Sequence, residues 1–310
     1  MTIVVAGGTG LAGSAIVRAY QATGAEVIAV NRSVVNLLDR DATTAFLKKT
    51  KPSLVVDAAA KVGGIGANNA FPVEFLSDNV RIQSNLMEAA HAADVEKFIF
   101  LGSSCIYPRD CAQPIKEEYL LTGPLEETNS AYAIAKIAGI ELIKSFRKEY
   151  GRTWISLMPT NLYGPNDNFE LQGSHVLPAF IRRFVEAAQN KVATETLWGT
   201  GSPKREFLHV DDLAAAVVHL GSTYDSPLHL NIGTGEDLTI KALAELVAEL
   251  AGFEGEIAWD STKPDGTPRK VLDVTKAKSL GWAPKISLRD GIASTIAWYK
   301  DATAKGEVRR

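Results

Sequence analysis

The stretch that decides the fold is residues 2–13, which read Thr2-Ile3-Val4-Val5-Ala6-Gly7-Gly8-Thr9-Gly10-Leu11-Ala12-Gly13. The apolar run that opens it is typical of a parallel strand buried on both faces. In the turn that follows, Gly7 suits a sharp reversal, Gly10 a close approach of backbone to a pyrophosphate, and Gly13 tight packing of helix on strand. The sequence therefore predicts a dinucleotide site at the amino end of a helix.

A helix predicted at 14–22 and a strand predicted at 26–30 complete a βαβ unit after the glycine turn. No acidic residue stands after the second strand, where the ribose 2′-hydroxyl of NAD would need one. Asn31-Arg32-Ser33 stands there instead. An arginine and a hydroxyl suit the extra 2′-phosphate, so Arg32 favours NADP over NAD.

The remainder of the chain alternates apolar strands with helices, which predicts an α/β fold with a doubly wound parallel sheet of the Rossmann type. The strands are expected at 54–60, 97–101 and 154–158, and the helices at 72–93 and 132–150. The Pro-, Gly- and Asn-rich run 159–173 predicts an exit into a smaller C-terminal α/β substrate domain. We therefore expect residues 1–165, with 210–235 returning to them, to bind NADP, and 166–209 with 236–310 to bind the substrate.

The bulk composition is that of an ordinary globular chain of 310 residues, with 46% hydrophobic residues and a net charge of −3. This charge gives no reason to expect a nucleic acid or an anionic membrane as partner. No apolar run is long enough to span a bilayer, and the amino end is a strand without signal-peptide features. Two cysteines make no disulfide framework, so a cytoplasmic location is expected.

A Tyr-x-x-x-Lys pair, Tyr132 and Lys136, follows Ser103 at the end of the strand 97–101. Residues four apart share one face of a helix. A nearby ammonium favours phenolate and is expected to lower the pKa of Tyr132. Because the glycine turn already predicts a nicotinamide nucleotide, the three side chains predict hydride transfer with proton donation.

With these residues in place, the chain resembles the extended short-chain dehydrogenase/reductases that act on nucleotide sugars. Within them it is most similar to the epimerase-reductases that convert GDP-4-keto-6-deoxy-D-mannose to GDP-L-fucose. The resemblance covers nearly the whole chain. Its diagnostic blocks are residues 58–65, 101–108, 132–139, 158–165, 205–212 and 263–270.

The resemblance implies NADP(H) as cofactor, a GDP-sugar as substrate, a homodimer, and a role for each matching residue. Tyr132 would protonate the C4 oxygen, Lys136 would hold the nicotinamide ribose, and Ser103 would hydrogen-bond the C4 oxygen. Cys105 and His175 would form the acid/base pair of a 3,5-epimerisation that precedes the reduction. The cofactor set is Gly7, Gly8, Thr9, Gly10, Leu11, Ala12, Gly13, Arg32, Leu101, Gly102, Ser103, Ser104, Lys136, Pro159, Thr160, Asn161, Leu162 and His175, and the GDP-sugar set is Arg183, Trp198, Arg205, Asp265 and Arg269.

The sequence departs from the family at Gly8-Thr9, where many members carry an arginine, so Arg32 carries more of the NADP preference. Ser104-Cys105-Ile106 lacks the acidic residue of the related 4,6-dehydratases, which disfavours water elimination. A nucleotide-sugar 4-epimerase, a GDP-4-keto-sugar reductase for a sugar such as colitose, and a non-catalytic NADP-sensing protein stay open as alternatives. The histidines show no metal-ligand spacing, so no metal is expected.

Overall fold

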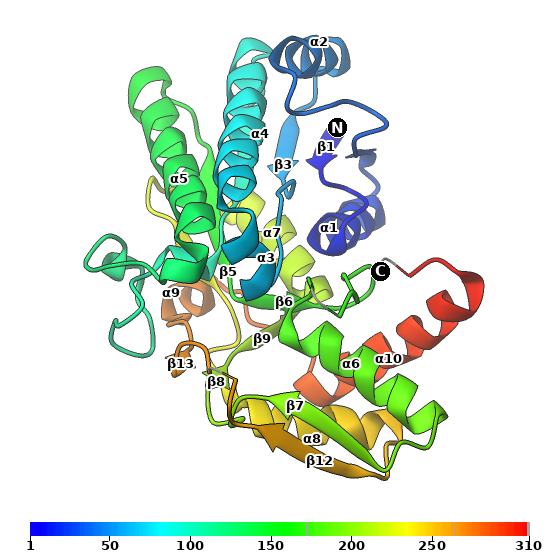
Figure 1. Cartoon of the computed structure of the whole chain (residues 1–310). Helices are drawn as coiled ribbons and strands as arrows, with labels where there is room; N and C mark the ends of the chain where they lie inside the picture. Colours follow the sequence, from blue (N-terminus) through cyan, green and yellow to red (C-terminus); the bar gives the residue numbers. More distant parts are fainter. Residues whose placement is uncertain (172, 264, 309–310) are drawn as a thin grey trace.

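The central sheet is built from the β-branched runs that the sequence places between helices. The computed structural model describes residues 1–171, 173–263 and 265–308. Within these residues six parallel strands form this sheet in the order β10-β5-β4-β3-β1-β2 (Figure 1). They are β1 (Thr2–Ala6), β2 (Glu26–Val30), β3 (Leu54–Asp57), β4 (Lys97–Leu101), β5 (Ile155–Pro159) and β10 (Leu230–Ile232).

Alternate residues of β1 enter two different cores, as the period of a strand requires. Val4 and Ala6 pack on one face of the sheet, whereas Ile3 and Val5 pack on the other. The strand is thus buried on both faces, which explains its uninterrupted apolar sequence.

Helices cover both faces of the sheet, which confirms the predicted doubly wound α/β class. One face carries α1 (Leu11–Ala22) against α7 (Val210–Thr223). The other carries α4 (Pro72–Ala92) between α2 (Arg40–Thr50) and α5 (Ser130–Tyr150), as Figure 1 shows. Late in the chain, α7 packs against α1 and β10 pairs with β5, so both elements belong to this layer.

A second layer of helices and short strands lies beyond the carboxyl ends of the sheet strands, at the bottom of Figure 1. Its helices α6, α8 and α10 pack on one another around a third core. They span Val176–Gln189, Ile240–Ala251 and Leu288–Lys305. The boundaries of the predicted substrate domain stay a prediction.

The strands of this second layer form three small sheets, β6-β9, β12-β7 and β11-β8-β13. They are β6 (Asn161–Tyr163), β7 (Thr194–Trp198), β8 (Lys204–Arg205), β9 (Phe207–His209), β11 (Leu238–Thr239), β12 (Glu256–Asp260) and β13 (Arg269–Lys270). The remaining short elements are α3 (Ile65–Ala70), α9 (Thr275–Ser279) and the 3-10 turns η1 (Ser104–Ile106), η2 (Glu117–Tyr119) and η3 (Glu127–Asn129). Among the described helices none combines the length and the apolar character needed to cross a membrane.

Most predicted elements agree with the structure to within a few residues. The predicted helix at 14–22 begins earlier, at Leu11, because the amide of Ser14 already bonds the carbonyl of Gly10 at 2.9 Å. The predicted strand 54–60 ends at Asp57, where the carboxyl group accepts a hydrogen bond from the amide of Ala59 at 3.1 Å and turns the chain.

Candidate active site

A cleft of about 2160 Å³ follows the carboxyl edge of the sheet and is lined from both layers. Pockets for one drug-sized ligand are roughly 300–1,000 Å³. The cleft therefore has room for a dinucleotide and a nucleotide sugar together. All residues that the sequence assigned to the cofactor, the substrate or catalysis line this cleft, except Gly8 and Arg269.

The glycine turn at one end of the cleft has the shape that a pyrophosphate needs. Gly7 has a φ of +72°, which favours glycine. A Cβ on Gly13 would lie 2.1 Å from the carbonyl oxygen of Gly7, so only glycine lets α1 start this close to β1. Gly10 is the residue just before α1 and lines the cleft. The turn thus fits a dinucleotide, with amide groups and a helix amino end free to face its phosphates.

Gly8 is needed for the packing of the turn against β2. A Cβ there would lie 2.7 Å from the Cα of Ala29 in β2. Gly8 therefore does not line the cleft, and its predicted contact with the cofactor stays a prediction.

Arg32 lies at the end of β2, exposed and facing the cleft. The side-chain oxygen of Asn31 accepts hydrogen bonds from the amide and the hydroxyl of Ser33, at 2.9 and 2.6 Å. This small turn holds the chain next to Arg32, and within residues 1–171, 173–263 and 265–308 no carboxylate forms an ion pair with Arg32.

Lys136 and Tyr132 project from α5 into the middle of the cleft, beside the end of β4. The ammonium of Lys136 donates to the carbonyl of Leu101 at 2.8 Å and lies 5.8 Å from the centre of the Tyr132 ring. Phe75 of α4 contacts the same ring edge-on, at 6.3 Å between centres. These contacts fix the phenol in front of the strand that carries Ser103.

The expected lowering of the Tyr132 pKa is wrong. Burial raises the pKa of Tyr132 well above its ordinary value, and the nearby Cys105 and Asp57 raise it further. Burial also lowers the pKa of Lys136, which Asp57 partly opposes. The physical reason is desolvation, which disfavours both charged forms. Tyr132 is therefore a protonated donor, which is the form that a nascent alkoxide requires.

Cys105 lies in η1, the turn that follows Ser103, and its side chain is buried. Burial raises the pKa of the Cys105 thiol, while Lys270, the Ser103 hydroxyl and Lys136 oppose the shift. The net direction of the Cys105 pKa is upward, because burial outweighs these three groups. Cys105 thus rests as a thiol with cations beside it to stabilise a thiolate.

His175 caps the amino end of α6 across the cleft. The surrounding cleft walls and Lys270 lower the pKa of its imidazole, so the ring is neutral at pH 7. A neutral imidazole and a protonated thiol in one cleft provide one proton acceptor and one proton donor.

The glycines of the block 58–65 bring His175 into position. The amide of Gly64 donates to the carbonyl of Gly173 at 3.0 Å. A Cβ on Gly64 would lie 2.6 Å from the carbonyl oxygen of Ser174. The two loops can approach this closely only because residue 64 has no side chain, and the second loop leads directly into His175.

Four of the five predicted GDP-sugar residues line the far end of the cleft, namely Arg183, Trp198, Arg205 and Asp265. Arg183 of α6 is paired with Glu195 and also donates to the carbonyl of Thr196 at 2.6 Å. Arg205 donates to the carbonyl of Thr267 at 2.5 Å. Trp198 exposes 72% of its surface and has the ammonium of Lys263 5.8 Å from its ring centre.

Asp265 accepts hydrogen bonds from the amide and hydroxyl of Thr200 at 3.0 and 2.7 Å, which closes the loop beside Trp198. Pro264, inside the block 263–270, lies outside the described residues. With these contacts in place, the ring of Trp198 and the side chains of Arg183 and Arg205 line the cleft.

Arg269 does not line the cleft and Lys270 does. Adjacent residues of a strand point to opposite faces, and in β13 Arg269 points away and pairs with Asp237. Lys270 stands beside Arg205 in the register of β13 and β8. The assignment of Arg269 to the substrate therefore stays a prediction without support from the cleft lining, and Lys270 is the cleft-lining cation that the sequence did not indicate.

Asp57 is a second residue that was missed. It ends β3 fully buried, and burial raises the pKa of its carboxyl to about 6, although Lys136 opposes the shift. The sequence could have indicated Asp57, because it stands at the end of a buried strand, next to the predicted cofactor turn.

Among the described residues no group of three or more His, Cys, Asp or Glu side chains is arranged to hold a metal. A smaller surface hollow of about 480 Å³ near the carboxyl end of α5, lined by Lys144, Arg147 and Arg152 among others, contains none of the predicted site residues.

Comparison with known proteins agrees with this geometry. Residues 3–233 match the model of the NAD dependent epimerase/dehydratase family. The chain belongs to this family. GDP-L-fucose synthase 1 of Arabidopsis thaliana is 54% identical over 298 residues, which are 96% of this chain and 92% of the relative. GDP-L-fucose synthase of Escherichia coli (strain K12) is 49% identical and covers 96% of both chains.

The fold of this epimerase/dehydratase family member is also found in solved relatives. The crystal structure of a GDP-L-fucose synthetase from Naegleria fowleri bound to NADP superposes with a TM-score of 0.90 at 28% identity, covering 100% of this chain and 96% of that one. The resemblance predicted from the sequence and the Rossmann-type class are confirmed. The roles given to individual residues stay predictions.

Proposed function

We propose that the chain is an NADPH-dependent enzyme that converts GDP-4-keto-6-deoxy-D-mannose to GDP-L-fucose by 3,5-epimerisation and 4-reduction. The observation that carries the proposal is the single cleft in which Cys105 and His175 lie together with Ser103, Tyr132 and Lys136. The near full-length identity to GDP-L-fucose synthases supports the same substrate. One cleft then holds an acid/base pair and a reduction site.

Epimerisation comes first in this proposal. The C4 ketone acidifies the C–H bonds at C3 and C5, so one acid/base pair can remove a proton from one face and return one to the other. The neutral imidazole of His175 and the thiol of Cys105 supply the acceptor and the donor. Lys270, whose charge lowers the pKa of the Cys105 thiol against the effect of burial, stabilises the thiolate when it forms.

Reduction follows at the same carbonyl. When bound, NADPH supplies the hydride. Ser103 hydrogen-bonds the C4 oxygen, Tyr132 donates the proton, and Lys136 holds the ribose while it is fixed by the carbonyl of Leu101. Arg32 binds the 2′-phosphate.

The remaining substrate contacts are electrostatic and aromatic. Arg183, Arg205 and Lys270 face the far end of the cleft, where a diphosphate needs cations. Trp198 offers an exposed face on which guanine can stack, beside the loop closed by Asp265. The base therefore lies between β7 and the 265–267 loop.

We further propose a homodimer in the cytoplasm. Several large apolar side chains are exposed around the first turns of α4 and α5, namely Phe71, Val73, Leu76 and Ile134. A second copy of the chain, presenting the same surface, would cover them. Both cysteines are free, which fits a reducing compartment.

The experiment that tests the function is incubation of the protein with GDP-4-keto-6-deoxy-D-mannose and NADPH. We expect one NADPH to be oxidised for each sugar and the product to match GDP-L-fucose by chromatography and NMR. A nucleotide-sugar 4-epimerase would give no net NADPH consumption, and either that result or a product that keeps the original C3 and C5 configuration would reject the proposal.

A further inference from the structure

A buried chain of hydrogen bonds lies directly behind the turn that carries Cys105. Tyr107, two residues past Cys105, is 3% exposed and does not line the cleft. Its hydroxyl donates to the side-chain oxygen of Asn231 at 2.5 Å, and the Nε2 atom of His229 lies 3.1 Å from the same hydroxyl. Because the single phenol proton is given to Asn231, the bond from His229 requires a proton on its Nε2.

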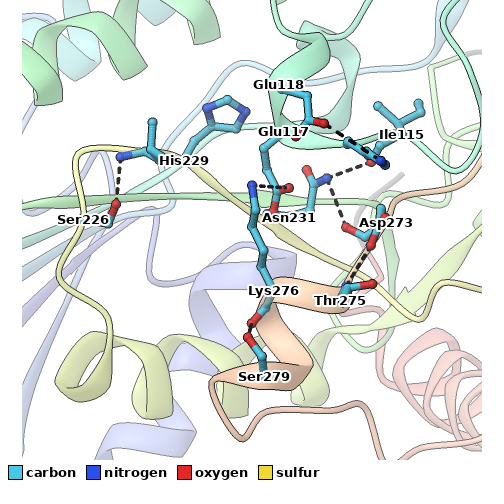
Figure 2. Close-up of polar contacts among 12 residues, drawn as sticks. Ile115, Glu117, Glu118, Ser226, His229, Asn231, Asp273, Thr275, Lys276 and Ser279 are labelled. Atoms are coloured by element: carbon cyan, nitrogen blue, oxygen red, sulfur yellow. Dashed lines mark hydrogen bonds and ion pairs between the residues drawn. The ribbon is translucent and has the colours of Figure 1, made fainter.

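Asn231 is fully buried in β10 and is held from three directions (Figure 2). Its side-chain nitrogen donates to the carbonyls of Ile115 and Asp273, at 2.9 and 3.2 Å. Its backbone amide donates to Glu117 at 3.2 Å, and the other oxygen of Glu117 lies 3.1 Å from the ammonium of Lys276. The acceptor that receives the Tyr107 hydroxyl is therefore fixed in place.

The turn that carries Cys105 is weakly held by its own backbone. The amide of Ile106 reaches the carbonyl of Ser103 at 3.3 Å, and the amide of Tyr107 reaches that of Ser104 at 3.5 Å. Both exceed the usual range of about 2.7–3.2 Å for such bonds. Before the turn, Gly102 is tied to β5 by a 2.9 Å bond to Leu157. The hydroxyl of Tyr107 is the firm attachment on the other side of Cys105.

We propose that Tyr107 is a positioning residue for the epimerisation, which holds the turn bearing Cys105 through the hydrogen bond from its hydroxyl to Asn231. The inference rests on the proposed function. Ser103 is next to Gly102, which is bonded to Leu157 of β5. Cys105 lies farther along the turn, between that bond and the hydrogen bond from Tyr107 to Asn231. The thiol is thus the group whose place depends most on Tyr107.

The Tyr107→Phe variant keeps the ring and removes only the oxygen. It leaves the Asn231 acceptor and the His229 donor without their partner inside the protein, so the turn loses its attachment. Proton transfer depends on close approach of donor and acceptor, and small misplacements reduce rates strongly. We expect the wash-in of solvent deuterium at C3 and C5 to fall about tenfold or more, which corresponds to about 1.4 kcal/mol.

Deuterium wash-in is measured by mass spectrometry with the NADP⁺-bound protein and GDP-4-keto-6-deoxy-D-mannose in D₂O, where no hydride is transferred. Saturating NADP⁺ also stabilises the folded state of a weakened variant. The kcat of NADPH oxidation should fall with the exchange rate, while KM for the sugar and Kd for NADPH stay within about twofold.

The matched control is Tyr20→Phe. Tyr20 is also a buried tyrosine, and its hydroxyl donates to the carbonyl of Val217 at 3.4 Å on the α1–α7 face, away from the cleft. This variant is expected to exchange like the wild type. If Tyr107→Phe lowers only the unfolding temperature and exchanges deuterium like Tyr20→Phe, the positioning role is overturned.

The Asn231→Ala variant removes the acceptor of the same hydrogen bond. The double variant should exchange no more slowly than the slower single variant, because both changes remove one interaction. Additive losses would count against the inference. Absence of exchange in the wild type would instead reject the proposed function, so the two failures are distinguishable.

Discussion

At the scale of single residues, desolvation decides the protonation states in the cleft. Burial raises the pKa of Tyr132 and of Cys105 and lowers those of Lys136 and His175. The phenol and thiol therefore rest as proton donors and the imidazole as an acceptor. These groups are neutral in the resting site and become charged only while the substrate reacts. The free-energy cost of burying their charged forms therefore does not arise between turnovers.

Tyr132→Phe separates the two half-reactions. We expect NADPH oxidation to fall by about a hundredfold or more, since a general acid contributes about 10²–10⁴ in rate. Deuterium exchange at C3 and C5 should persist, because the phenol serves only the ketone oxygen. Cys105→Ser is the reciprocal variant, in which exchange is lost while NADPH binding survives. Loss of exchange in Tyr132→Phe would show that the division of labour is wrong.

Which of the two residues of β13 faces the cleft could not be predicted from the sequence. Arg269 and Lys270 stand side by side in a short polar run, and nothing in their neighbours distinguishes them. Which one faces the cleft depends on the register of β13 with β8, set by residues about sixty positions away. By contrast, Tyr132 and Lys136 could be paired from the sequence because a helix fixes residues four apart locally.

At the scale of elements, the glycine turn acts through two different constraints. Gly13 permits contact within the protein, whereas Gly10 meets only the carbonyl of Gly7, at an ordinary distance of 3.4 Å, and faces the cleft. Gly13 is therefore required by packing within the protein, whereas Gly10 has open space on the side of the cleft.

Gly13→Ala and Gly10→Ala form a matched pair for this distinction. Gly13→Ala should lower the unfolding temperature by about 5 °C, because a tightly packed contact is overfilled. It should also weaken NADPH binding by about tenfold or more. Gly10→Ala should weaken binding similarly without lowering the unfolding temperature. Thermal unfolding and NADPH titration check both, and equal stability of the two variants would contradict the packing argument.

The long central strands could be predicted from the sequence, but the short strands of the second layer could not. Runs such as 2–6 and 97–101 are apolar because both faces of these strands are buried, and the bounds of 2–6, 26–30 and 97–101 agree with β1, β2 and β4. The strands β8, β11 and β13 have two residues each, which is too short for any periodic pattern. Their pairing depends on contacts between distant segments, and the far end of the cleft is built from them.

At the scale of the whole molecule, the exposed apolar side chains around the first turns of α4 and α5 are the surface through which we expect two copies of the chain to form a homodimer. Val73 exposes 76% of its surface and Ile134 46%. Stable interfaces bury about 800 Å² on each partner, so these residues would form the centre of a larger contact between two copies.

The Val73→Glu and Ile134→Glu double variant should disrupt the dimer. Light scattering after size exclusion should give twice the 33.3 kDa chain mass for the wild type and a single chain mass for the variant. The control is Leu228→Glu, an equally exposed apolar side chain between α7 and β10, which should leave the dimer intact. A dimer that withstands both charges would place the interface elsewhere.

The late return of α7 and β10 to the sheet has a consequence for biosynthesis. While the chain emerges from the ribosome, β5 is made before residues 166–209, and its pairing partner β10 only follows them. During that interval β5 is an open sheet edge, and the core that α7 covers is exposed to water. Nascent chains of this length are therefore expected to be prone to pair with one another, so chaperone protection is expected to matter in this window of translation.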